Sequence, residues 1–260
     1  MIDLEPGILF PAFVAGLLVL ATHIPFGMKV LARGVIFADL AVAQIAGLGV
    51  VAAGLLDLAG QPLLVQLIAA GSALCGAALL AWIEHRLPEV KEACIGLTFV
   101  LAASSGILLM SRDVHAGEHL KDLLAGQILW VNDSQLIATA LLSAVLLAVW
   151  RWQQARLGNL GFYALFALAV TASVQLVGVY LVFASLIVPA LATYRLASRR
   201  MGYAFGIGVA GYAVGLLLSA WFDLPSGATI VWAMAMVGLL TAFTGSYLSA
   251  MTSITENRTE

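Results

Sequence analysis

Residues 161–194 read GFYALFALAVTASVQLVGVYLVFASLIVPALATY and contain no charged side chain. A helix needs about 20 residues to cross a bilayer, so this run is too long for one crossing. Gly178 offers a break near its middle. The run therefore predicts two short crossings, or a broken or re-entrant helical hairpin around 174–180. An ordinary tight hairpin, followed by a helix kinked at Pro189, is the alternative.

The break bears on function, because irregular backbone at membrane depth must be buried in protein or line a water-filled cavity. Broken helices are also where transporters tend to bind their substrates. The remaining sequence has seven further apolar runs of about span length. Together they predict an all-α, polytopic membrane bundle of eight or nine transmembrane helices, one domain over 1–260. The seven runs cover 8–28, 35–56, 62–83, 93–111, 135–150, 202–222 and 226–248.

The composition supports this class, since 62% of the residues are hydrophobic and only 10% are charged. Soluble domains carry about 25% charged residues. The net charge of −2 argues against a nucleic-acid partner. The first residues are acidic and lack the basic segment of a signal peptide, so we expect the first apolar run to be kept as a helix.

Lysine and arginine residues predict the orientation, because cytoplasmic loops carry an excess of them. With Lys29 and Arg33 in the cytoplasm, alternating crossings place ten of the twelve basic residues there. Only Arg112 and Lys121 fall outside. A nine-pass chain then has its N-terminus outside and its C-terminus in the cytoplasm.

Asp39 stands alone in the apolar stretch 34–51. A carboxylate at the centre of a span costs about 2.5–3.5 kcal/mol on insertion scales, so it should face a wet path, a partner or an ion. We predict that Asp39 lines a translocation path for a cation, with Gln44 nearby and His23 as a relay or ligand. The alternatives are an Asp satisfied by hydroxyls or amides, and a Gln44 or His23 that hydrogen-bonds a neighbouring helix.

The segment 112–133 is the most polar part of the chain outside its ends, and is predicted to be an external loop. Four side chains three to four residues apart would share one helix face. Imidazoles and carboxylates in this pattern predict a site for a divalent transition metal. A solvated face of an amphipathic interfacial helix is the alternative. The four residues are His115, Glu118, His119 and Asp122.

The sequence contains no phosphate-binding loop, no His-Glu-x-x-His motif and no nucleophile elbow. We therefore expect a transport subunit and not an enzyme, with ATP hydrolysis on a separate chain if ATP drives the transport.

Several stretches resemble the permease subunits of bacterial ABC importers for zinc, manganese and iron(II). The resemblance covers roughly 10–245, and the segment around Gly178 is its strongest part. The stretches are RGVIFADLAVAQIAGLG (33–49), EACIGLTF (92–99), LLAGQIL (123–129), VQLVGVYLVFASLIVPALAT (174–193) and DLPSGATIV (223–231).

The resemblance implies a multi-pass protein of the bacterial cytoplasmic (inner) membrane, with no cofactor of its own. It implies a second permease copy, cytoplasmic ATP-binding subunits and a periplasmic or lipoprotein metal-binding protein as partners. In the family, an Asp matching Asp39 is followed four residues later by a His, and the pair is thought to line the metal path. Here Ala43 stands in place of that His.

The coupling segment toward the ATPase is also shorter than in the family. Only Arg151, Ala155, Arg156 and Gly158 remain as candidates for that contact. The resemblance thus predicts the permease of an ATP-driven importer of divalent transition metal ions. A permease for a metal chelate, such as a siderophore or cobalamin, is one alternative. A non-transporting membrane component of metal homeostasis is the other.

Overall fold

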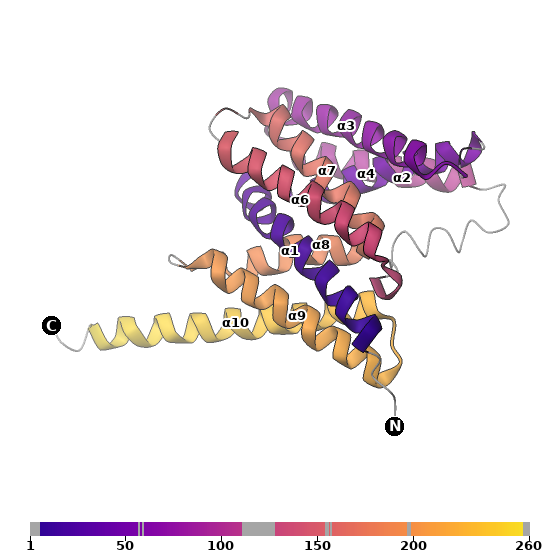
Figure 1. Ribbon diagram of the computed structural model, residues 1–260. Coiled ribbons are helices and arrows are strands. Elements are labelled where there is room, and N and C mark those ends of the chain that lie inside the picture. Colours follow the sequence, from indigo (N-terminus) through magenta and orange to yellow (C-terminus); the bar gives the residue numbers. More distant parts are fainter. Residues whose placement is uncertain are drawn as a thin grey trace.

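A computed structural model describes residues 6–56, 58, 60–110, 128–153, 156, 158–196 and 199–256, with side chains described through Phe243. Within these ranges the regular structure is entirely helical, and eight helices are long and apolar enough to cross a membrane. The predicted all-α polytopic bundle is therefore confirmed (Figure 1). The helices are α1 (Pro6–Arg33), α2 (Ala38–Leu55), α3 (Pro62–Arg86), α4 (Lys91–Met110), the 3-10 helix η1 (Ile128–Trp130), α6 (Asp133–Gln153), α7 (Asn159–Val177), α8 (Val179–Ala192), α9 (Arg200–Phe222) and α10 (Ser226–Glu256).

The run 161–194 is broken at Gly178, as predicted. Gly178 ends α7 and begins α8, with φ 84° and ψ 161°. Only glycine populates that region readily, because a Cβ would clash with the backbone there. α8 contains Pro189, ends three residues later at Ala192, and is shorter than the eight candidate spans.

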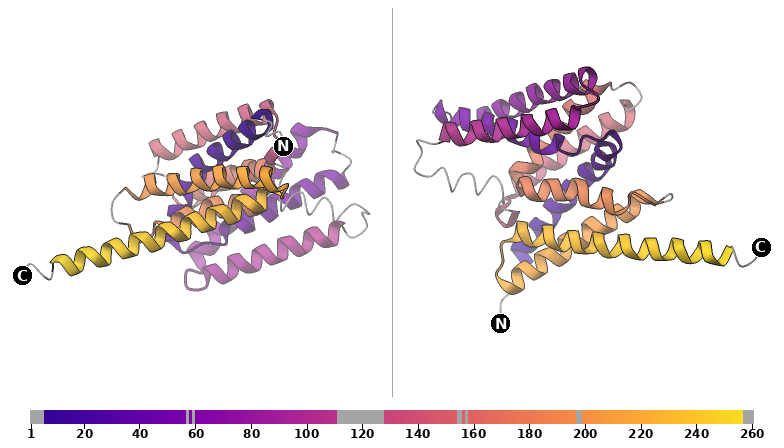
Figure 2. Two further views of the ribbon diagram at one scale, coloured as in Figure 1. Left: turned by 90° about the horizontal axis from the view of Figure 1, so that it is seen from below. Right: turned by 180° about the vertical axis from the view of Figure 1, so that it is seen from behind.

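The helices form two groups, which Figure 1 and the right view of Figure 2 show as an upper and a lower layer. In the α2 group, α2 packs against α3 and α4, and α3 packs against α7. In the α1 group, α1 packs against α8 and α9, and α10 packs against α8 and α9. α8 thus leaves its predecessor α7 and joins the other group. The break at Gly178 is what carries the chain from one group to the other.

An aromatic cluster joins α1, α6 and α7. The Phe26 ring of α1 lies 5.2 Å from Trp150 of α6 and 6.0 Å from Phe162 of α7. Phe162 stacks on Phe166 at 5.8 Å. Such pairs contribute about 0.5–1.5 kcal/mol each beyond the burial of their area. The cluster therefore stabilises the contact between the two groups.

Basic residues gather where α1 and α3 end and α4, α7 and α9 begin, and we call this the basic end of the bundle. Arg33 contacts α3, α4 and α7 there. Lys29 and Arg151 meet Met201 of α9 at the same end. The backbone of α10 runs on past the other helices on this side (Figure 2). This grouping follows the distribution that the positive-inside rule predicts; Arg112 and Lys121 lie outside the described residues.

Candidate functional site

Asp39 lies in the first turn of α2, close to the basic end and not halfway along a span. Helix α1 stops at Arg33, and a short turn, in which Gly34 has φ 63°, leads into α2. Asp39 is only 1% exposed, and neither carboxylate oxygen has a hydrogen-bond partner. The unpaired N–H groups of a helix start favour a nearby negative charge without bonding it. Both oxygens thus remain open as acceptors for a cation.

Ala43 follows Asp39 by one helical turn and is also buried, at 3% exposure. Positions four apart share a helix face, so Ala43 lies where the imidazole of the resembling family would stand. Gln44 is half-buried, and the structure gives it no hydrogen bond. Asp39 is therefore the only ligand-type side chain on its own face of α2 within a turn of it.

His23 lies inside α1 and is 1% exposed. Its Nδ1 is 3.0 Å from the carbonyl oxygen of Val19. The hydroxyl oxygen of Thr22 is also 3.0 Å from Nδ1. Because a carbonyl only accepts hydrogen bonds, the bond to Val19 requires Nδ1–H as donor, and in the neutral ring Nε2 then carries the free lone pair. Nε2 is buried and has no hydrogen-bond partner. Metal-binding histidines commonly use this arrangement, with the second ring nitrogen held by a backbone carbonyl.

His23 and Asp39 lie at different depths. His23 precedes the end of α1 by ten residues, or about 15 Å at 1.5 Å per residue. Asp39 lies just beyond the turn that follows that end. The two groups are therefore successive positions along the bundle and not two ligands of one ion. The described residues contain no cluster of three or more His, Cys, Asp or Glu side chains suited to a metal.

The predicted external cluster of His115, Glu118, His119 and Asp122 lies outside the described residues, as does Ala155. Of the other coupling candidates, Arg151 is near the end of α6. Arg156 and Gly158 lie between α6 and α7. All three are exposed at the basic end.

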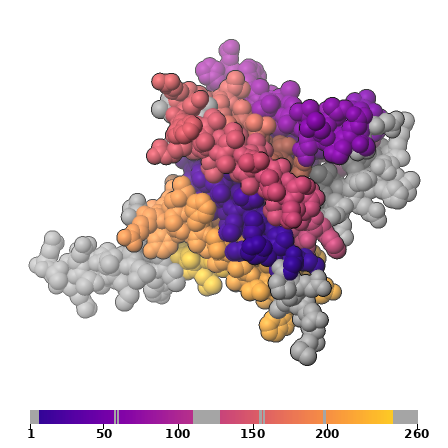
Figure 3. Space-filling view, in the orientation of Figure 1, coloured from indigo at the N-terminus to yellow at the C-terminus, as the bar shows by residue number. Residues whose placement is uncertain are grey.

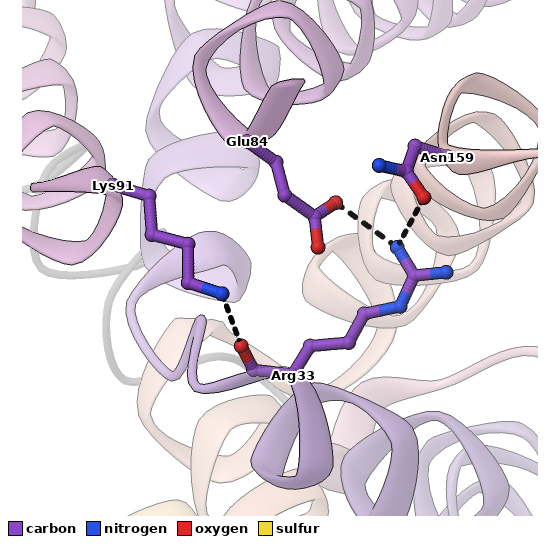
Figure 4. Close-up of polar contacts among 4 residues, drawn as sticks. All are labelled: Arg33, Glu84, Lys91 and Asn159. Carbon is purple, nitrogen blue, oxygen red and sulfur yellow. Dashed lines mark hydrogen bonds and ion pairs between the residues drawn. The ribbon is translucent and has the colours of Figure 1, made fainter. Parts of the chain in front are cut away.

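A polar network at the basic end was not predicted (Figure 4). Arg33 donates to Glu84 at 3.0 Å and to Asn159 at 3.3 Å. Its guanidinium also lies 4.2 Å from the centre of the Phe162 ring. A cation over an aromatic face is attracted by the ring quadrupole. The sequence held one signal of this network. Glu84 directly follows the third apolar run, 62–83, where a carboxylate needs a basic partner.

The start of α4 holds the turn before Asp39 from both sides. Lys91 donates to the carbonyl oxygen of Arg33 at 2.6 Å. Glu92 accepts from the backbone N–H of Phe37 at 3.0 Å. These two bonds fix the ends of the turn that leads to Asp39. The network therefore positions the carboxylate, although none of its members contacts it.

We expect Glu84→Gln to lower the free energy of unfolding by about 1.5–3 kcal/mol, as for a hydrogen bond to a charged group. The Arg33 and Glu84 side chains are 18% and 13% exposed, so solvent screens this pair only in part. Denaturant unfolding in detergent, run as a double-mutant cycle with Arg33→Met, measures the coupling. Arg86→Met, an exposed cation at the same end, should change little. Strictly additive effects of the two substitutions would contradict the assignment.

Comparisons with known proteins give the chain its family. A profile of the ABC 3 transport family matches residues 6–160 and 154–245. The "Probable iron transport system membrane protein" of Haemophilus influenzae is 26% identical over 163 residues, which is 54% of this chain and 60% of that protein. An uncharacterized membrane protein of Synechocystis is 28% identical over 174 residues, 58% of this chain and 62% of that one.

These matches thus span about three-fifths of the length of either relative. A solved structure, PsaBC from Streptococcus pneumoniae in complex with Fab, superposes with a TM-score of 0.67 at 23% identity. The superposition covers 90% of this chain and 89% of the solved chain, so the two chains share a fold. Because the profile accounts for nearly the whole described bundle, the chain belongs to the ABC 3 transport family.

Proposed function

We propose that this chain is the permease subunit of an ATP-driven, binding-protein-dependent importer of divalent transition metal ions. The observation that carries the proposal is Asp39, a buried carboxylate whose two oxygens have no partner in a protein of a transport family. A buried charge without a partner is costly. A divalent cation passing this position would offset that cost.

His23 supports the same proposal at a second depth. Its bare Nε2 suits zinc and iron(II), which accept imidazole ligands, whereas the carboxylate of Asp39 suits manganese as well. An ion would meet His23 on its way to Asp39, with Gln44 beside the lower part of the path. Single-ligand positions hold a metal weakly, and weak sites in series allow it to leave. The Haemophilus relative, a probable iron transport system membrane protein, favours iron among these cargoes.

The partners belong to the same proposal. A second permease copy would complete the path, and a periplasmic or lipoprotein metal-binding protein would deliver the ion from outside. Cytoplasmic ATP-binding subunits would meet Arg156 and Gly158 at the basic end, where the α6–α7 connection is exposed. With these partners the chain would lie in the bacterial inner membrane. His115, Glu118, His119 and Asp122 remain candidates for receiving the ion at the outer mouth.

A metal chelate is the second candidate cargo. Ala43 favours it, because a larger complex needs no pair of ligands on α2. A chelated metal would pass Asp39 by its overall charge and not by coordination. Free metal and chelate then compete differently for uptake.

The test is metal accumulation by elemental analysis of cells with and without the gene, grown in metal-depleted medium. Loss of one divalent metal in the deletion strain, restored by the wild-type gene, is the expected result. Restored uptake only when a siderophore or cobalamin is supplied would select the chelate. Unchanged metal contents under all conditions would overturn the importer.

A further inference from the structure

A cavity of about 610 Å³ lies at the basic end between α1, α6 and α9. Figure 3 shows this face, with the indigo surface of α1 between the red surface of α6 and the orange surface of α9. The path residues Asp39 and His23 take no part in it. Its lining consists of Pro25, Met28, Lys29, Leu147, Trp150, Arg151 and Met201.

The charge of the cavity is entirely positive. Lys29 is half-buried and Arg151 is exposed, and no acidic side chain is part of the lining. Neither cation has an ion pair or hydrogen bond among the residues that the structure describes. Arg33, in contrast, is neutralised by Glu84 one turn further along α1. The two free cations therefore leave a site that an anion would complete.

The rest of the lining is apolar and reaches into the bundle. Pro25 precedes the end of α1 by eight residues, or about 12 Å along the helix. Leu147 precedes the end of α6 by six residues, or about 9 Å. Trp150 lies nearer the mouth, three residues or about 4.5 Å before the end of α6. Its ring packs against Phe26, and tryptophan is enriched at membrane interfaces. The cavity thus has cations toward its mouth and apolar walls at acyl-chain depth.

This combination matches one class of molecule. An inorganic anion would bind the two cations but leave the apolar walls exposed to water. A cytoplasmic protein would meet the exposed helix ends and not the walls about 9–12 Å further along the helices. Basic pockets between transmembrane helices on the cytoplasmic side suit phospholipid head groups. We propose that this cavity binds an anionic phospholipid of the cytoplasmic leaflet, with Lys29 and Arg151 on its phosphate and its chains along Met28 and Leu147.

The proposal does not depend on the transported cargo and can be tested on the purified chain. Native mass spectrometry from detergent would follow retention of added phosphatidylglycerol against phosphatidylcholine. We expect preferential retention of phosphatidylglycerol, weakened about 25-fold in the double variant Lys29→Gln/Arg151→Gln, or about fivefold per cation. A matched control, Arg86→Gln/Arg195→Gln, removes the same charge from exposed positions outside the cavity and should retain the lipid.

Equal losses in both double variants would overturn the proposal, because they would reduce the effect to general attraction by the basic end. Equal retention of the two lipids would overturn it as well. Displacement of phosphatidylglycerol by millimolar inorganic phosphate would assign the cavity to a free anion. Thermal unfolding of each variant establishes that it is folded. If the cavity variant keeps the lipid but loses a co-expressed ATPase in pull-down, the cavity belongs to that protein instead.

Discussion

Replacing Asp39 with Asn is expected to reduce metal accumulation to the level of cells that lack the gene. Asn keeps the shape of the side chain and removes its charge, so the path loses a ligand without gaining a cavity. Because neither oxygen of Asp39 has a partner, the substitution breaks no hydrogen bond. It also removes a carboxyl group whose charged form is costly to bury without a partner. The purified variant should therefore unfold at the same temperature as the wild type or at a higher one.

A loss of metal accumulation without a loss of thermal stability would separate a transport role of Asp39 from a structural one. A residue that merely stabilised the fold would lose stability and transport together. Asp133→Asn provides the control, since Asp133 is exposed at the far end of α6 and should tolerate the change. Elemental analysis of cells and thermal unfolding in detergent give the two readouts. Wild-type accumulation in the Asp39→Asn strain would remove Asp39 from the mechanism.

Gly27→Val is expected to destabilise the bundle by about 3 kcal/mol or more, the upper part of the range for overpacked positions. A Cβ at this position would collide with the carbonyl oxygen of Leu186 in α8. That atom belongs to a helix backbone and cannot rotate away as a side chain could. α1 and α8 would have to separate, and α8 would lose its contact with the core.

The matched control is Gly206→Val, also inside a helix but with open space around its Cα. Valine is the better helix former of the two, so this variant should be unchanged or slightly more stable. Unfolding in detergent and the yield of membrane-inserted protein would compare them. Equal stability of the two variants would show that α1 and α8 are not packed as closely as described.

The spans could be predicted from the sequence because each is a local property of a continuous apolar run. The run 35–56 became α2 (Ala38–Leu55), and the break at Gly178 fell where the prediction placed it. The first run was predicted to end at 28, yet α1 continues to Arg33. Lys29 and Arg33 lengthen the helix beyond the apolar stretch because long basic side chains reach the interface from inside it.

The polar network could not be predicted, because its partners come from distant parts of the chain. Arg33 meets Glu84 and Asn159, which follow it by 51 and 126 residues. The burial of Asp39 could be inferred from its apolar surroundings. The freedom of its two oxygens could not, since it depends on which groups the four helices packed against α2 present. Tertiary packing determines both the partners of Arg33 and the unpaired oxygens of Asp39, and hydrophobic periodicity does not predict such packing.

The division of the bundle into two helix groups has a mechanical consequence. Two of the connections between the groups are only a few residues long, namely the turn 34–37 and Gly178. Any swing of one group against the other concentrates its torsion in these joints. Lys91 and Glu92 bond to the backbone of one joint. Among the described residues no side chain bonds to Gly178 itself, and the nearest such bond joins Gln66 to Gln175 in α7. The bundle thus has two hinges of unequal stiffness, and the carboxylate of Asp39 lies next to the stiffer hinge, the turn 34–37.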